Sequence, residues 1–213
     1  MAAQSLPRPI IIGITGNIGS GKSSFCAFLE QAGLAVYYAD LLAKAVLRDP
    51  EVLSKLAARW GNEIAEDGKP RSEVIAAKVF GKPEELAFLN SLVHPGTLKQ
   101  MQQLVDQSTT PVVLFEVPLL FEARLEDCFD YLVLITAPLE LRTRRIIDRD
   151  KATRQQVGQR AAAQLPDSEK ASRCDLVILN DKGLKDLEEQ ALIFVRQLPE
   201  LRTRPKRPFY SGN

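Results

Sequence analysis

The segment from Ile10 to Leu29 constrains the fold of this chain more than any other, because it joins an apolar run, a glycine-rich loop and a helical pattern. Residues 10–14 form a β-branched run of the kind that a buried parallel strand requires. From Lys22 onward, apolar residues are spaced so that they share one face of a helix. Between the two, the chain reads Gly16-Asn17-Ile18-Gly19-Ser20-Gly21-Lys22-Ser23. The sequence therefore predicts a strand, a tight loop and a helix in direct succession.

Residues 16–23, called the phosphate loop below, match the pattern of Gly, four residues, Gly, Lys and Ser or Thr that binds phosphate groups. Glycines allow backbone N–H groups to turn inward around a phosphate chain, and the start of the helix adds its positive dipole end. Lys22 is placed to reach the β- and γ-phosphates, and Ser23 to ligate Mg²⁺. Because the pattern lies between a strand and a helix, we expect a nucleotide site here rather than a glycine-rich turn.

Four further apolar runs predict the remaining strands, at residues 34–38, 112–116, 131–136 and 176–179. Residues 41–110 contain several helical stretches and almost no strand signal, which predicts an all-helical insertion; two of these stretches, 83–92 and 95–107, are separated at Pro95. Further helices are expected from Leu139 to Arg149, from the N-cap residue Thr153 to Leu165, and over 184–198. This order of elements is typical of an α/β protein with a parallel sheet.

Composition excludes several classes of protein. The 213 residues are 45% hydrophobic and 26% charged, which is enough for one substantial domain with a core. Lys and Arg number 28 against 27 Asp and Glu, and this balance gives no reason to expect a nucleic-acid partner. One histidine and three scattered cysteines argue against a zinc site and for a reducing, cytoplasmic compartment. No apolar run reaches the roughly 20 residues that a membrane span needs, so no membrane partner is expected.

Two acids at the ends of predicted strands are candidates for phosphoryl-transfer chemistry. Asp40 follows the strand at 34–38, and ligands gather at the carboxyl ends of strands in such sheets. It could accept a proton from an attacking hydroxyl, help to hold Mg²⁺ through water, or only cap the helix that begins near Leu41. Glu116 ends the strand at 112–116, where it either supports the metal or is simply an acid at a strand end.

Arginines are concentrated on one predicted helix. Arg142, Arg145 and Arg149 occur at positions i, i+3 and i+7 and therefore share a face. Arg is suited to bidentate phosphate contact, and phosphoryl transfer needs cations near the γ-phosphate. The helix is therefore either an arginine-bearing lid or a solvated face. His94, followed by Pro95, is by itself more typical of a packing or capping residue than of a binding site.

Taken together, these features resemble the dephospho-CoA kinase family, whose members phosphorylate the ribose 3′-hydroxyl of dephospho-coenzyme A in the last step of coenzyme A synthesis. The resemblance covers about residues 11–198. The chain departs from the family pattern at Tyr38, where an Asp is usual, and at Asn17, Glu116 and Gly183. The matching segments are the phosphate loop with the residues before it, Ala39-Asp40, His94-Pro95, Val117-Pro118-Leu119-Leu120-Phe121-Glu122, Arg145, Arg149-Asp150, 160–164, Glu169-Lys170 and 175–180.

The resemblance implies a P-loop kinase fold, which is α/β with a five-stranded parallel sheet flanked by helices, a helical substrate-binding insertion and an arginine-bearing lid. The nucleotide-binding core would comprise residues 9–40, 111–138 and 171–200. Residues 41–110 would form the helical acceptor (CoA) domain, residues 139–170 the lid, and residues 201–213 a basic flexible tail. The implied cofactor is Mg²⁺ with ATP as co-substrate. The implied partners are ATP and dephospho-CoA, bound by a monomer or weak oligomer.

The same resemblance implies a set of site residues, of which Asp40, Lys22 and Arg145 would be catalytic, with Asp40 as the base for the 3′-hydroxyl. Ser23 would hold Mg²⁺, with Asp40 or Glu116 acting through water. ATP would be bound by Asn17, Ile18, Gly19, Ser20, Gly21, Lys22, Ser23, Ser24, Arg145, Arg149 and Asn180. Dephospho-CoA would be bound by Asp40, Arg71, His94, Pro118, Leu119, Leu120, Glu122 and Arg160.

Two alternatives would use the same phosphate loop. Another small-molecule or nucleoside kinase, acting for example on shikimate or uridine, would differ in residues 41–110, which make the acceptor pocket; the His94-Pro95 and 118–122 matches favour dephospho-CoA instead. A nucleotide-dependent switch of the GTPase class would carry Asp-x-x-Gly after a strand and Asn-Lys-x-Asp for guanine. Neither motif occurs in the sequence.

Overall fold

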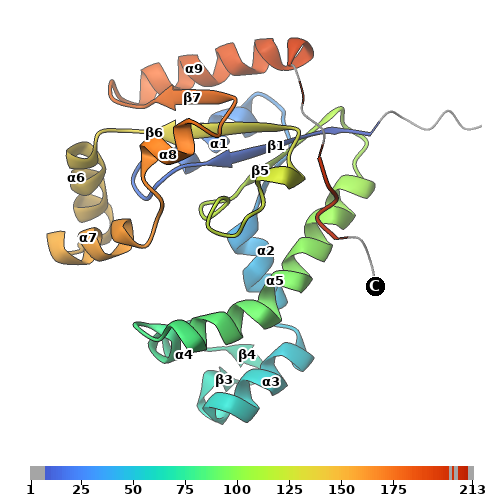
Figure 1. Ribbon diagram of the computed structural model, residues 1–213, viewed down its shortest axis with the longest axis vertical. Coiled ribbons are helices and arrows are strands. Elements are labelled where there is room, and N and C mark those ends of the chain that lie inside the picture. Colours follow the sequence, from blue (N-terminus) through green and yellow to red (C-terminus); the bar gives the residue numbers. More distant parts are fainter. Residues whose placement is uncertain (1–7, 202, 204–205, 211–213) are drawn as a thin grey trace, which may run out of the picture. The chain divides into compact units, whose positions relative to one another are not determined.

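The computed structural model describes residues 8–201, 203 and 206–210, and these fall into two compact units (Figure 1). The first unit comprises the described residues up to Tyr38 together with Val105–Pro208. The second comprises Ala39–Leu104 and the described residues from Phe209. The predicted lid, residues 139–170, belongs to the first unit.

The first unit is built on a parallel sheet in the order β2-β5-β1-β6-β7, so the first strand of the chain is central. The predicted five-stranded parallel sheet is confirmed. The run at 34–38 pairs only from Val36, and the first strand continues to Thr15. The strands are β1 (Ile10–Thr15), β2 (Val36–Tyr38), β5 (Val112–Glu116), β6 (Tyr131–Thr136) and β7 (Leu176–Leu179).

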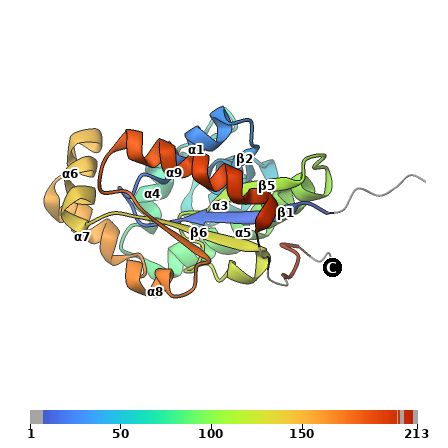
Figure 2. The same ribbon diagram turned by 90° about the horizontal axis from the view of Figure 1, so that it is seen from above.

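Both faces of this sheet are covered, as its apolar strands require. Helices α1 (Lys22–Gln31) and α9 (Leu184–Gln197) cover one face (Figure 2), where the rings of Phe25 and Phe194 lie 6.0 Å apart in the main core. Residues 117–130, which include the short helix η2 (Glu126–Cys128), and helix α8 (Asp167–Ala171) lie toward the other. On that side a Cβ on Gly13 would come within 2.8 Å of Leu120. Each fully buried Leu or Phe side chain contributes about 1.5–3 kcal/mol.

The charged segment after β6 forms two helices, α6 (Leu139–Asp150) and α7 (Arg154–Ala162). The expected N-cap at Thr153 is confirmed, because its hydroxyl accepts a hydrogen bond from Gln156 N in a complete capping box. The prediction that this helix continues to Leu165 is wrong. Leu165 precedes Pro166, which disfavours helical backbone, and its N–H instead donates to the carboxylate of Glu122.

The second unit is mainly helical, with α2 (Ala39–Val46), α3 (Pro50–Trp60), η1 (Asn62–Ile64), α4 (Ser72–Val79) and most of α5 (Pro83–Asp106). Leu56 and Ile64 are fully buried in its core. The expected all-helical insertion is corrected by a small antiparallel ladder of β3 (Ala65–Glu66) and β4 (Lys69–Pro70). Asp67 and Gly68 between them have φ of 49° and 71°, as in the two-residue turns that connect hairpin strands.

Helix α5 is also longer than predicted, because it continues through Pro95, where two separate helices were expected. A proline inside a helix removes one backbone hydrogen bond and costs about 3 kcal/mol. Val93, Thr97, Met101 and Val105 are nevertheless buried at steps of four residues, so one apolar stripe crosses the proline and offsets that cost. None of the described helices, α5 included, is both long and apolar enough to cross a membrane.

The predicted flexible tail lies partly outside the described residues, since Arg202 and Arg204 are among those left out. Residues of the described part make contacts with the rest of the chain. The backbone N–H of Arg207 donates to Asp127 O at 2.7 Å, and that of Phe209 donates to Gln102 Oε1 at 3.0 Å. Phe209 is 6% exposed. The helix before it ends in η3 (Leu198–Glu200).

The contact between α2 and α5 gives a test of this packing. A Cβ on Gly96 would lie 2.8 Å from a Val46 methyl group, and valine cannot move aside easily. We expect Gly96→Ala to lower the free energy of unfolding by about 1–3 kcal/mol in thermal denaturation, and Val46→Ala to restore part of the loss. Gly158→Ala is the matched control, because Gly158 has nothing within 4 Å and Ala gains about 0.5–1 kcal/mol in a helix. Equal effects of the two Gly→Ala changes would contradict this packing.

Candidate active site

The phosphate loop leaves β1 and enters α1 with a backbone conformation that only glycine adopts readily. Gly16, Gly19 and Gly21 have φ of 147°, 79° and 99°. All three also lack room for a side chain, since a Cβ at Gly19 would lie 2.8 Å from Arg142 O and the other two are closer still. A Cβ would lie 2.1 Å from Ile135 O at Gly16, and 2.1 Å from Asn180 Nδ2 at Gly21. The three glycines are therefore required by the fold of the loop, which is of the type that turns N–H groups toward a bound phosphate.

Asn180 holds the loop from the side of β7. This residue is 2% exposed, and its Nδ2 donates to Ser20 O at 2.8 Å. Its Oδ1 and its backbone O both accept hydrogen bonds from Arg145 Nη2, each at 3.2 Å. Three residues that were predicted to bind ATP, Ser20, Arg145 and Asn180, are thus brought together, and an arginine of α6 is anchored beside the loop.

Lys22 and Glu116 form a buried pair below the loop. Lys22 Nζ lies 3.9 Å from Glu116 Oε1, and both residues are more than nine-tenths buried. The sheet register pairs Glu116, the last residue of β5, with Ile14 of β1. The carboxylate therefore lies beside the end of β1, which the phosphate loop follows. Buried charges are tolerated when they are paired. Burial and then the charge of Glu116 raise the pKa of the nearby Cys26 thiol, so Cys26 is a neutral packing residue.

Oxygen donors suited to Mg²⁺ are few around the loop. Ser23, at the start of α1, has an exposed side chain, and Glu116 is the nearest acid that the strand register identifies. Within the described residues no three His, Cys, Asp or Glu side chains cluster as metal ligands. This arrangement fits Mg²⁺, which is usually held by one or two protein groups together with substrate phosphates and water.

The segment from Pro118 to Glu122, called the acceptor turn below, does not expose all the side chains that the sequence predicts for substrate contact. Leu119 is 49% exposed, whereas Leu120 is fully buried against Gly13 and serves the core. Glu122 Oε1 accepts hydrogen bonds from Leu165 N at 2.8 Å and from Lys170 Nζ at 2.9 Å. Burial alone would raise the pKa of Glu122, but these two hydrogen bonds lower it below its ordinary value.

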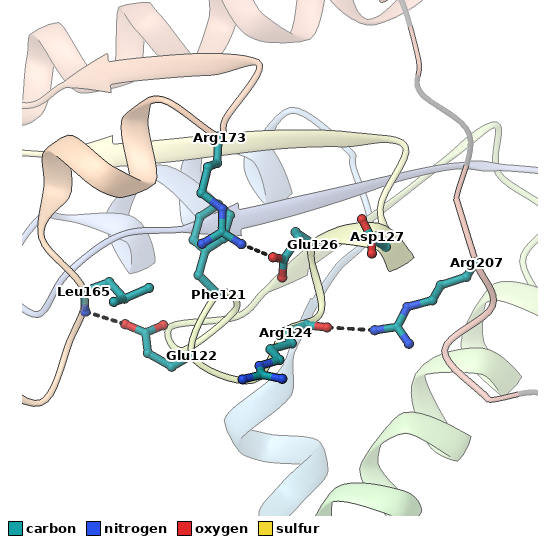
Figure 3. Close-up of a pocket in the computed structure, with 8 residues that line it drawn as sticks. All are labelled: Phe121, Glu122, Arg124, Glu126, Asp127, Leu165, Arg173 and Arg207. Atoms are coloured by element: carbon teal, nitrogen blue, oxygen red, sulfur yellow. Dashed lines mark hydrogen bonds and ion pairs between the residues drawn. The ribbon is translucent and has the colours of Figure 1, made fainter.

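A pocket of about 620 Å³ lies beside the acceptor turn (Figure 3). On one side Glu122 reaches toward Leu165, and on another the guanidinium of Arg173 lies 4.5 Å from the centre of the Phe121 ring and pairs with Glu126. Arg207 donates to Arg124 O at its far end. Basic and acidic groups alternate around this pocket, so it has no single charge preference.

The arginines of the lid differ in their surroundings. Arg149 and Arg160 both pair with the carboxylate of Asp150, at 2.7 and 3.1 Å, and more than half of each side chain is exposed. Arg142, predicted to share a face of α6 with Arg145 and Arg149, is buried. Its Nε donates to Ala137 O at 3.0 Å and its Nη2 lies 3.2 Å from Asp167 Oδ2. Arg142 therefore anchors α6, whereas Arg149 and Arg160 are exposed enough to meet a ligand.

Three predicted residues lie in the second unit. Asp40 is exposed in the first turn of α2, and Arg71 is the N-cap residue of α4. His94 lies in α5, where partial burial lowers the pKa of its imidazole. Tyr38, where the resemblance implies an Asp, donates from its hydroxyl to Glu30 Oε2 at 3.0 Å. Tyr38 therefore joins the end of β2 to α1 and does not replace a carboxylate.

Sequence reasoning missed two residues that contact the loop. Gln164 accepts a hydrogen bond at its Oε1 from Ile18 N at 2.8 Å, and Lys170 donates from its Nζ to Asn17 Oδ1 at 2.8 Å. Both occur in segments that match the family, but a lone Gln or Lys in a charged helix carries no local signal of burial. Only the folded arrangement shows that they touch the phosphate loop.

The fold and this site together define a phosphate-loop kinase: a parallel sheet with a central first strand, a glycine-rich loop that follows it, and Arg145 of α6 beside that loop. The sequence profile of the dephospho-CoA kinase family matches residues 10–186. The chain belongs to the dephospho-CoA kinase family.

Individual relatives agree with the family match. A dephospho-CoA kinase of Thermus thermophilus is 39% identical over 181 residues, which is 85% of this chain and 88% of the relative. A dephospho-CoA kinase of Deinococcus radiodurans is 36% identical and covers 92% of this chain and 96% of its own length. A crystal structure of a Thermus thermophilus protein, 39% identical, superposes with a TM-score of 0.80 over 92% of this chain and 99% of its own.

The Asn180 contacts generate a prediction about nucleotide affinity. Asn180→Ala removes the side-chain hydrogen bonds to Ser20 O and Arg145 Nη2, a loss of about 1–3 kcal/mol, and keeps the bond from Arg145 to the backbone O of residue 180. We expect the Kd for a non-hydrolysable ATP analogue, measured by calorimetry, to rise about tenfold, which corresponds to about 1.4 kcal/mol. Asn62→Ala, at an exposed site in the second unit, should leave the Kd unchanged. The same Kd in both variants would show that Asn180 does not support the loop.

Proposed function

We propose that this chain transfers the γ-phosphoryl group of ATP to the ribose 3′-hydroxyl of dephospho-CoA and releases coenzyme A and ADP. The observation that carries this proposal is the phosphate loop braced by Arg145 and Asn180 in a member of the dephospho-CoA kinase family. In the reaction a bond forms between the acceptor oxygen and the γ-phosphorus, the bond from that phosphorus to the β–γ bridging oxygen breaks, and the acceptor proton passes to a base.

Residues 17–24, which include most of the phosphate loop, and the lid supply the electrostatic part of this reaction. Backbone N–H groups of the loop and the Nζ of Lys22 hold the β- and γ-phosphates. Arg145, and Arg149 once it exchanges Asp150 for a phosphate, stabilise the charge that spreads over the γ-phosphoryl oxygens. Ser23 would hold Mg²⁺, with Asp40 or Glu116 acting through water. Mg²⁺ when bound neutralises phosphate charge. Asn180 keeps the loop and Arg145 in place.

Asp40 is the proposed base for the 3′-hydroxyl. It comes two residues after the end of β2, and β2, β5 and β1 run parallel, so their carboxyl ends lie at the same edge of the sheet. Ligands of such sheets bind at that edge. Its exposed carboxylate accepts the proton as the new bond forms.

Dephospho-CoA would be bound by the residues that the family resemblance implies for it. Arg71 and Arg160 offer cations for its diphosphate, and His94, Pro118 and Leu119 offer polar and apolar contacts. Glu122 contributes by holding the end of the acceptor turn. We also infer that the protein acts in the cytoplasm as a monomer or weak oligomer. We expect no nucleic-acid or membrane partner.

Asp40→Asn tests the base. The amide has the same size but cannot accept the proton, so we expect kcat to fall about 100-fold or more. The Kd values for ATP and dephospho-CoA, from calorimetry, should stay within about threefold. Asp67→Asn is a matched control at the exposed hairpin turn, where Asn tolerates the positive φ of 49°. A kcat near that of the wild type in Asp40→Asn would remove Asp40 from this role.

A comparison of acceptors tests the substrate. In a coupled assay of ADP release, the wild-type chain with MgATP should turn over dephospho-CoA with a kcat/KM at least about 100-fold above that for shikimate, uridine or adenosine, because only dephospho-CoA offers the diphosphate and pantetheine contacts. Removal of Mg²⁺ with a chelator should abolish turnover. A preference for one of the other acceptors would overturn the substrate assignment and leave the kinase assignment standing.

A further inference from the structure

Lys170, on α8, is a fully buried charged residue that the proposed reaction does not use. Its ammonium donates to Asn17 Oδ1 at 2.8 Å and lies 2.9 Å from Glu122 Oε1. Removing an ammonium group from water costs several kcal/mol, so a lysine is kept in such a place only when its partners compensate for that cost. One of these partners is at the tip of the phosphate loop, and the other ends the acceptor turn.

The same junction contains residues 164–170, the last residues of the predicted lid. Asn17 Nδ2 donates to Leu165 O at 3.1 Å, and Leu165 N donates to Glu122 Oε1 at 2.8 Å. Beside them, Ile18 N donates to Gln164 Oε1 at 2.8 Å. Residues 164–170 are therefore hydrogen-bonded to both the loop and the acceptor turn. Lys170 is the cation at the point where these three segments meet.

The charge of Glu122 depends on this lysine. Its Oε2 is buried and has no hydrogen-bond partner among the described residues, so Oε1 and its two donors compensate for the carboxylate. The Leu165 N–H is neutral, and Lys170 is the charged donor. Loss of Lys170 would leave a buried carboxylate without a counter-charge at the end of the acceptor turn.

We infer that Lys170 is a positioning residue that fixes the tip of the phosphate loop, the acceptor turn and the end of the lid relative to one another. Lys170 has no exposed surface, so it acts through Asn17 and Glu122 rather than by touching substrate. A residue with this role affects the alignment of the reacting groups more than the binding of either substrate. The inference rests on the proposed phosphoryl transfer and adds to it a residue that ties the ATP side to the acceptor side.

The test compares variants that separate charge compensation from positioning. Lys170→Met alone leaves Glu122 uncompensated and is expected to lower the Tm. Lys170→Met with Glu122→Gln removes both charges and should recover most of the Tm. Glu122→Gln alone leaves Lys170 without its counter-charge and should lower the Tm, but it keeps an amide oxygen that can accept from Lys170 and keeps the bond from Lys170 to Asn17. Asn17→Ala keeps the buried ion pair but removes both side-chain contacts from the loop side, the one with Lys170 Nζ and the one with Leu165 O. Lys55→Met, at an exposed pair with Glu51, is the matched control.

The expected result is a split between kcat and KM. With ATP and dephospho-CoA as substrates, kcat should fall about 10- to 100-fold in the double variant and in Asn17→Ala, because the reacting groups are misaligned. Both KM values should stay within about threefold, because the substrates still bind. Glu122→Gln alone should keep at least about a third of kcat, and Lys55→Met all of it.

Three results would overturn the inference: a folded double variant with the kcat of the wild type, Asn17→Ala with the kcat of the wild type, or equal losses in Glu122→Gln and the double variant. If the double variant does not fold, Asn17→Ala alone decides. Failure of the proposed function would be seen separately, as a wild-type protein that does not phosphorylate dephospho-CoA.

Discussion

The close approach of the phosphate loop to the strands beside it is the constraint on which the rest of the site depends. At Gly16 and Gly21 even a methyl group would meet Ile135 or Asn180 at 2.1 Å. The loop can be this close only because β1 lies at the centre of the sheet, with β6 on one side and the end of β7 beyond it. The order of strands therefore decides which residues brace the loop, and Asn180 and Arg145 occupy those places.

Charge near the loop is handled by buried pairs rather than by solvent. Three largely buried ion pairs lie near the loop: Lys22 with Glu116, Arg142 with Asp167, and Lys170 with Glu122. Such pairs add little net stability, because desolvation opposes the attraction between the charges. They hold oriented dipoles and cations where a polyphosphate needs them, which is the preorganisation that phosphoryl transfer requires. Arg149 and Arg160, each with more than half of its side chain exposed, share the carboxylate of Asp150.

The sequence predicts the sheet well and the polar junctions poorly. The strands, the loop and the Thr153 cap follow from local patterns, which are strong where a segment is buried on both faces. The continuous helix through Pro95 could not be predicted from local pattern. The side chains that stabilise it on both sides of the proline do so only when they are buried by tertiary packing. The hairpin had a signal in Asp67-Gly68, but its strands have only two residues each. Lys170 was matched only as part of a family segment, since no local pattern separates a buried lysine from an exposed one. The roles of Asp40, Arg71 and His94 remain predictions.

The central claim is that this chain moves the γ-phosphoryl group of ATP onto dephospho-CoA rather than onto water. The most direct measurement uses ATP labelled with ¹⁸O in the γ-phosphoryl group, together with dephospho-CoA and Mg²⁺, and locates the label by mass spectrometry of the products. The account predicts that the labelled phosphoryl group appears on the ribose 3′-oxygen of coenzyme A, in an amount equal to the ADP formed. Label found in inorganic phosphate, with dephospho-CoA unchanged, would contradict it and indicate a nucleotide-hydrolysing switch instead.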